Sequence, residues 1–241
     1  MALGQDGGDG AAVPEAPRLR EGVPWGARDV LLGTLLAAVL FLLLTLLSLA
    51  PAAVLPLSEG EAAAVELAGD LLAPALAMVA AAAVVVRWRG GTAAHLGLRT
   101  FPWRRGWLIP AVLALDCVLT AAYFVLAGAA GLLAVPAAEP GPDPALAGVL
   151  DGAAGIILAP VAEELFFRGF MFAGLVPRLG IGGAALASAL LFSAVHLDGG
   201  VLLPFTAGAV LLAYAYRWSG SLWFPILAHA GYNGVVTLAL L

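Results

Sequence analysis

The chain has 241 residues, of which 62% are hydrophobic and 11% are charged, and its formal net charge is −5. Soluble globular domains are about 45–50% apolar and about 25% charged, so this composition excludes an ordinary soluble domain. The negative charge and the lack of a basic tract exclude nucleic acid as a partner. A single cysteine, Cys117, excludes an internal disulfide and a zinc site built on paired cysteines.

Along the chain, one segment without periodicity is followed by apolar runs that alternate with turn signals. Residues 1–27 are rich in Gly, Pro, Asp and Glu and predict a disordered tail. Residues 30–50 form an apolar run that exceeds the ~7–15 apolar residues of a signal peptide and can cross a bilayer. Six further apolar segments predict membrane-spanning helices, at residues 62–86, 107–130, 145–176, 181–197, 201–217 and 221–241.

The positive charges support this count of seven spans. All 11 Lys and Arg residues are arginines. With the N-terminus in the cytoplasm, every arginine lies on or near the cytoplasmic side, as the positive-inside rule requires. We therefore expect an all-α, polytopic transmembrane helical bundle. The arginine-only, alanine-rich composition suggests a bacterial source and hence a location in the bacterial plasma membrane.

Three charged residues interrupt the apolar run at 158–172 within the fourth segment, and a charge at the bilayer centre costs about 2.5–3.5 kcal/mol. Glu164 and Arg168 are four residues apart, so they can pair on one helical face. Glu163 is about 100° away around the helix and is expected to point elsewhere. Glu164 therefore has a structural explanation, whereas Glu163 needs a partner or a functional role.

Two histidines in later spans have companions at helical spacing. Phe192 precedes His196 by four residues, and His229 precedes Asn233 by the same interval. A buried carboxylate with a nearby imidazole can activate water, and a second imidazole with an amide can bind an oxyanion. Two histidines and one glutamate could instead bind Zn²⁺ with water in the fourth position, although the sequence has no HExxH motif.

Structural explanations of these residues also exist. A Glu–Arg pair can be a strut, and a membrane histidine can simply link helices by hydrogen bonds. Asp70 and Asp116 rank below the three clusters, although an intramembrane acid is a functional candidate by default. The aromatic residues near the clusters are interpreted as anchors at the membrane interface; they include Trp218, Trp223 and Tyr232.

The three motifs, EExxxR at 163–168, FxxxH at 192–196 and HxxxN at 229–233, together resemble the CPBP family of CAAX proteases and bacteriocin-processing enzymes. The resemblance covers about residues 120–241 as a protease domain, behind N-terminal spans at 28–119. It implies transmembrane helices around a conical cavity that opens to the cytoplasm and laterally to lipid. By this resemblance Glu163 is the general base and His196 assists it, while His229 and Asn233 bind the oxyanion. Glu164, Arg168 and Phe192 are supporting residues.

The resemblance implies an intramembrane endopeptidase that cuts membrane-associated protein or peptide substrates, with membrane lipid as its surroundings. Family members are described both as zinc enzymes and as glutamic proteases. We favour the glutamic type and expect no cofactor, with zinc as the alternative. A non-catalytic immunity or scaffold protein and a proton-coupled transporter are further hypotheses, the latter weakened by the lack of an evident internal repeat. Prenylated CAAX substrates are not expected in a bacterium, and the oligomeric state is left open.

Overall fold

The computed structural model describes residues 22–101, 103–131 and 152–240. Residues 1–21 of the predicted tail lie outside these residues, whereas the end of the tail does not and its Trp25 is buried, so the prediction of disorder is wrong there. The stretch 135–144, whose four prolines predict a loop, also lies outside the described residues. In the described ranges the chain is helical and contains no strand, which confirms the all-α prediction. The elements are α1 (Ala27–Val54), α2 (Glu59–Trp88), η1 (Trp103–Arg105), α3 (Leu108–Ala129), η2 (Ala154–Leu158), α5 (Ala159–Glu163), η3 (Glu164–Phe172), α6 (Ala173–Ala194), α7 (Leu202–Ser219) and α8 (Trp223–Leu240).

Four helical stretches in the described ranges are long and apolar enough to cross a membrane: Ala27–Pro51, Glu59–Trp88, Leu108–Ala129 and Ala154–Ala194. The fourth contains two rods, because the backbone leaves helical geometry at Gly180, where φ is 68°. This break falls on the predicted turn signal between the segments at 145–176 and 181–197. The last two predicted segments also form helices, α7 and α8, but neither meets the same criterion. Membrane-spanning helices are thus confirmed, whereas the number seven stays a prediction.

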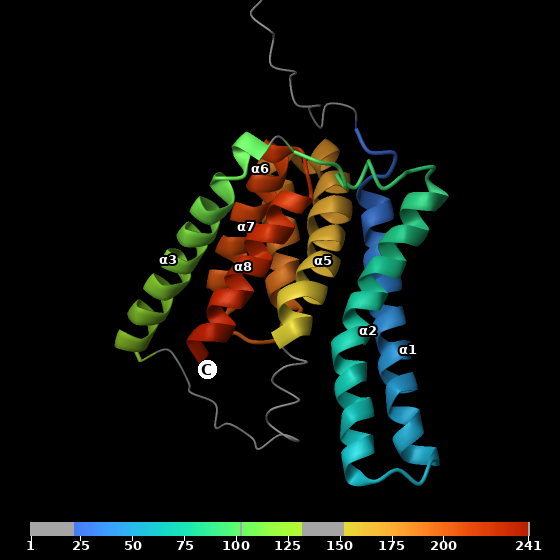
Figure 1. Ribbon diagram of the computed structural model, residues 1–241. Helices are drawn as coiled ribbons and strands as arrows, with labels where there is room; N and C mark the ends of the chain where they lie inside the picture. The colour runs from blue at the N-terminus through green and yellow to red at the C-terminus, as the bar shows by residue number, and fades with distance from the viewer. Residues whose placement is uncertain (1–21, 102, 132–151, 241) are drawn as a thin grey trace, which may run out of the picture.

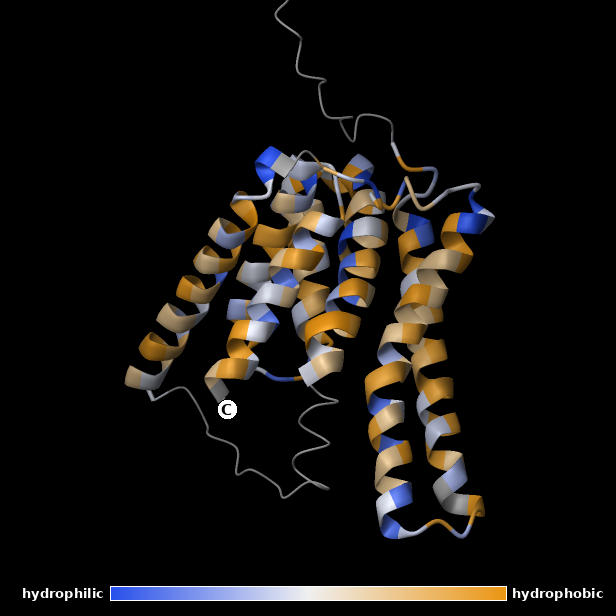
Figure 2. Ribbon diagram, in the orientation of Figure 1, coloured by the Kyte–Doolittle hydropathy of each residue, from blue (hydrophilic) through white to orange (hydrophobic). Residues whose placement is uncertain are grey.

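The helices run roughly side by side along one axis (Figure 1). Helices α1 and α2 form a long hairpin on one flank, α3 lies on the opposite flank, and α5 to α8 lie between them. The flanking helices carry apolar residues along most of their length (Figure 2). Large side chains such as Leu35, Leu42 and Val125 are exposed, as expected of surfaces that face lipid tails.

Local sequence signals explain how the α1–α2 hairpin begins and how it is attached to the central helices. Ser58 caps α2, accepting a hydrogen bond from the backbone N–H of Glu61, whose carboxylate accepts one from the backbone N–H of Ser58. Asp29 and Arg89, from α1 and the end of α2, form an ion pair of 2.8 Å. The indole N–H of Trp25 donates to the carbonyl oxygen of Phe170 at 2.8 Å, and this bond ties the start of the hairpin to η3.

The helix that carries the EExxxR motif is not a regular α-helix. Residues Ala154–Leu158 and Glu164–Phe172 have π-helical geometry, on either side of the short α-helical stretch Ala159–Glu163. In a π-helix the backbone bonds join residues five apart, and such segments occur mostly at functional sites. The Glu163–Glu164 junction is where α5 passes into η3.

Candidate active site

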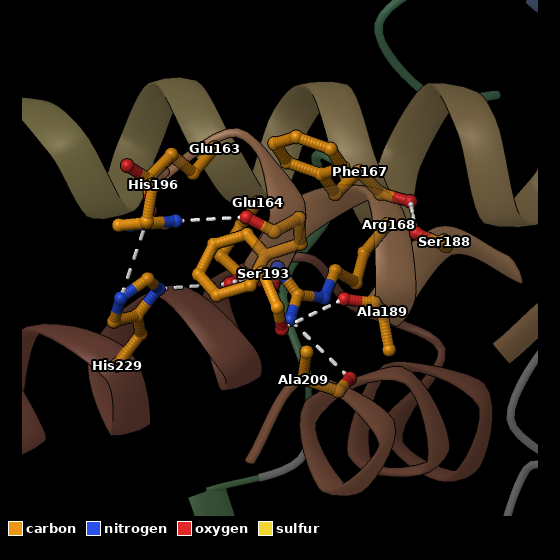
Figure 3. A network of polar contacts seen from close by, with 11 residues as sticks. Glu163, Glu164, Phe167, Arg168, Ser188, Ala189, Ser193, His196, Ala209 and His229 are labelled. Carbon is orange, nitrogen blue, oxygen red and sulfur yellow. Dashed lines mark hydrogen bonds and ion pairs between the residues drawn. The ribbon is translucent and has the colours of Figure 1, made fainter. Parts of the chain in front are cut away.

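The innermost part of the site is a chain of charged groups. Glu164 and Arg168, both fully buried, form an ion pair of 2.8 Å between Oε1 and Nη1, which confirms the predicted pairing. The same Glu164 oxygen lies 2.9 Å from Nδ1 of His229 on α8 (Figure 3). A buried charge is tolerated when it is paired and hydrogen-bonded. Glu164 therefore joins η3 to α8 through two basic partners.

Arg168 extends this chain of contacts to two more helices. Its Nη2 donates to the carbonyl oxygen of Ala209 on α7 at 3.3 Å. Its guanidinium lies over the ring of Phe192 on α6, 4.8 Å from the ring centroid, which is a cation–π distance. Arg168 thus positions α6, α7 and η3 around one point.

Glu163 approaches His229 from the other side of the ring. Its Oε2 is 3.7 Å from His229 Nε2, whereas Glu164 contacts Nδ1 (Figure 3). The expectation that Glu163 points away from the Glu164–Arg168 pair is only half correct. Glu163 takes no part in the pair, yet both carboxylates face the same imidazole. At 3.7 Å the Glu163–His229 contact is too long for a direct hydrogen bond and leaves the carboxylate free for another partner.

His196 lies beyond the end of its helix, where the prediction placed it inside a span. Helix α6 ends at Ala194, and His196 is exposed in the following turn. Its Nδ1 is 2.8 Å from the carbonyl oxygen of Phe192, and the two rings are 4.9 Å apart. A carbonyl can only accept, so Nδ1 carries the proton and Nε2 is left to accept one.

Asn233 is anchored to the start of the motif helix. Its Nδ2 donates to the carbonyl oxygen of Gly155 at 2.7 Å. An amide nitrogen carries two protons, so one N–H of Asn233 remains for a ligand. Asn233 lies one turn after His229 on α8, and the two residues border the same cavity.

All four residues predicted to be catalytic line one cavity of about 210 Å³: Glu163, His196, His229 and Asn233. Phe192 contributes to its wall, whereas Glu164 and Arg168 support it from behind. Three polar residues that were not predicted as part of the site also line the cavity: Asp116, Thr120 and Tyr232. Tyr232 was interpreted as an interface anchor, which is wrong, because its hydroxyl lies 3.2 Å from Thr120 on α3.

A second cavity of about 470 Å³ meets the first at Glu163 and His196. Most of its lining is apolar and comes from α1, α2, η3 and α6; it includes Ala37, Phe41, Met78, Phe166 and Leu191. The cavity therefore separates the α1–α2 hairpin from the site helices at the level of Glu163.

The arrangement also bears on metal binding. Within the described ranges, no three His, Cys, Asp or Glu side chains are grouped as a metal site requires. Both Nδ1 atoms of the site histidines have protein partners, so only the Nε2 atoms of His196 and His229 could serve as ligands.

These observations define a helical membrane protein with a polar site of hydrolase type between its helices. Residues 144–235 match the model of a protein family described as Rce1-like, type II CAAX prenyl endopeptidase Rce1-like. This stretch contains all three motifs, and the match confirms the resemblance to the CPBP and CAAX protease family. The family match and the four long apolar helices together indicate a membrane protein whose residues 144–235 are similar to intramembrane endopeptidases. No curated protein and no solved structure matches the chain.

Proposed function

We propose that this protein is an intramembrane endopeptidase of the glutamic type, in which Glu163 activates the water. The observation that carries the proposal is the convergence of Glu163, His196 and His229 on one cavity from three separate elements. A non-catalytic scaffold would not need a half-buried carboxylate that has, among the described residues, no ion-pair partner closer than 3.7 Å.

The reaction follows from the positions of these groups. A water between Glu163 and the Nε2 of His196 gives its proton to the carboxylate while its oxygen bonds to the carbonyl carbon of the scissile peptide. The carbonyl oxygen then carries a negative charge, which the free N–H of Asn233 and a protonated Nε2 of His229 can stabilise. Glu163 next passes the proton to the leaving nitrogen, the C–N bond breaks, and an acid and an amine are released.

Glu164 and Arg168 act through His229 in this scheme. The contact between Glu164 and Nδ1 of His229 holds the ring so that Nε2 faces the cavity. A carboxylate in this position orients the imidazole and stabilises its imidazolium form, in which Nε2 also carries a proton. Arg168 holds Glu164 in place.

A zinc-dependent reaction that uses the same residues is the second candidate. In that case the Nε2 atoms of His196 and His229, with Glu163, would hold the ion, and the metal would supply the activated water. Dialysis against a chelator distinguishes the two. The glutamic mechanism expects unchanged cleavage after chelation, whereas loss that is restored by Zn²⁺ would establish the metal enzyme.

We further propose seven crossings, with the N-terminus in the cytoplasm of a bacterium, on the basis of the arginine distribution. The arginine-bearing connection between α2 and α3 and the α6–α7 turn with His196 lie at opposite ends of the bundle (Figure 1). An opening to the cytoplasm, which the family resemblance implies, therefore conflicts with this orientation. We propose that substrate enters laterally from lipid, along the apolar cavity beside α1 and α2. A cysteine placed at Asp198 in a Cys117→Ser background, probed with an impermeant reagent, reports which face holds the α6–α7 turn.

The decisive experiment replaces Glu163 by Gln in protein reconstituted into liposomes with quenched fluorescent peptides. General-base catalysis contributes about 10²–10⁴-fold, so we expect cleavage to fall about 10³-fold. The matched control is Glu66→Gln, which makes the same change at an exposed position of α2 and should leave cleavage unchanged. Retained activity in Glu163→Gln protein would show that the base lies elsewhere and would end the proposal.

A further inference from the structure

Asp116 is a buried acid for which the proposed reaction has no role. It lies on α3, is only 7% exposed, and lines the cavity together with Glu163 and His229. Within the described ranges, no hydrogen bond or ion pair reaches its carboxylate. Its carboxylate oxygens reach the cavity, and an intramembrane acid without a protein partner is a functional candidate, so a counterpart that enters the cavity is expected.

The carboxylate of Asp116 is held in position by a close approach of α3 to α7. A Cβ added to Gly208 would lie 2.5 Å from Asp116 Oδ1, so only glycine leaves room for the carboxylate there. Thr120 is one helical turn further along α3, and the hydroxyl of Tyr232 on α8 donates to its Oγ1 at 3.2 Å. These three residues form a corner of the cavity that is rich in acceptor oxygens.

In the described ranges, the basic groups of the site form their ion pairs with Glu163 and Glu164 and not with Asp116. The sequence contains no lysine, because all 11 Lys and Arg residues are arginines. A cation that pairs directly with Asp116 would therefore come from a molecule that binds in the cavity.

We infer that Asp116, with Thr120 and Tyr232, is a specificity subsite that receives a lysine or arginine side chain of the substrate near the scissile bond. This inference rests on the proposed peptidase function and names the substrate class: peptides with a basic residue beside the cut. A cationic side chain donates hydrogen bonds and accepts none, which suits a carboxylate flanked by hydroxyl oxygens. Charge complementarity of this kind selects among substrates more than it adds affinity.

The first test measures binding and does not depend on cleavage. The probes are N-acetylated, fluorescently labelled leucine–alanine peptides that carry either one lysine or one norleucine, so that only the side chain can supply the cation. In Glu163→Gln protein we expect the lysine peptide to bind about tenfold more tightly than its norleucine twin. Adding Asp116→Asn should remove that difference. Equal binding of the two peptides, or a preference that survives Asp116→Asn, would overturn the inference.

The second test measures the ratio of kcat/KM for the two peptides in otherwise unaltered protein. We expect Asp116→Asn to lower this ratio about tenfold. Gly208→Ala should lower it too, because the added methyl group displaces the carboxylate. Asp70→Asn is the matched control, since Asp70 is an exposed acid on α2 that borders a different cavity with Glu163. An equal fall with Asp70→Asn would mean that diffuse negative charge, and not this subsite, sets the preference.

The two tests separate failure of the inference from failure of the proposed function. Selective binding of the lysine peptide without cleavage by the unaltered protein would disprove the peptidase and leave the cation subsite standing. Cleavage that shows no preference for lysine would disprove the subsite and leave the peptidase standing.

Discussion

The two walls of the cavity are built in different ways. The first wall, formed by the motif helix and α8, has its charged groups tied to one another through Glu164, Arg168 and His229. The second wall is α3, which presents Asp116 and Thr120 and, among the residues that the structure describes, has one side-chain hydrogen bond to another helix, with Tyr232. In the span Ala154–Ala194, 28% of the residues in its most apolar 18-residue stretch are buried in the protein. The same fraction for α3 is 6%.

We interpret the first wall as the one that carries out the proposed chemistry and the second wall as the one that recognises the substrate. Proton transfer and oxyanion binding require groups held within a fraction of an ångström, so the reacting wall needs a network that cannot shift without breaking ion pairs. A wall that only recognises side chains can move, and in the part of the chain that the structure describes α3 has a single side-chain hydrogen bond to a neighbouring helix. If the first wall is the rigid one, substitutions in its charged network should have larger effects than substitutions in the α3 wall.

The largest effect is expected for Arg168→Leu, which breaks the network at its centre. This change leaves Glu164 buried without its cation, and removal of one partner of a buried pair costs about 3–5 kcal/mol. We expect a large fall in unfolding temperature in detergent and loss of cleavage. The double variant Glu164→Gln/Arg168→Met should be more stable than Arg168→Leu alone. A double variant that is equally unstable would show that packing, and not charge pairing, holds this wall.

The next effect is expected for Asn233→Ala, which removes the proposed oxyanion donor and its bond to Gly155. Loss of one such donor lowers kcat by about 10²–10³-fold in other hydrolases. We expect kcat to fall by about 10²-fold with little change in KM, measured with the quenched peptides. A change in KM alone would mean that Asn233 binds substrate without stabilising the oxyanion.

The smallest effect is expected on the α3 wall, for Tyr232→Phe. The variant loses one hydrogen bond of 3.2 Å to Thr120, which is worth about 1 kcal/mol. Unfolding temperature should fall slightly, and Thr120→Val combined with Tyr232→Phe should cost no more than either alone. A loss as large as that of Arg168→Leu would contradict the view that this wall is loosely held.

The sequence predicted the local features of this molecule well. Long apolar runs require helices in a membrane, and residues four apart on a helix meet regardless of what surrounds them. That spacing alone predicted the Glu164–Arg168 pair and the contact between the rings of Phe192 and His196. Both are present. The motifs also led to the family, which the match over residues 144–235 supports.

Contacts between distant residues were decided only by the tertiary structure. The position of His229 between Glu163 and Glu164 joins residues 65 and more positions apart, and no local period encodes such a contact. Asp116, Thr120 and Tyr232 have ordinary places in their own helices, and only the approach of α3 to α7 and α8 brings them to the cavity. Helix periodicity is set by backbone geometry within one segment, whereas the choice of neighbouring helix depends on side-chain packing summed over the whole bundle. For that reason the sequence indicated the candidate catalytic residues, whereas only the fold showed that α3 faces them across the cavity.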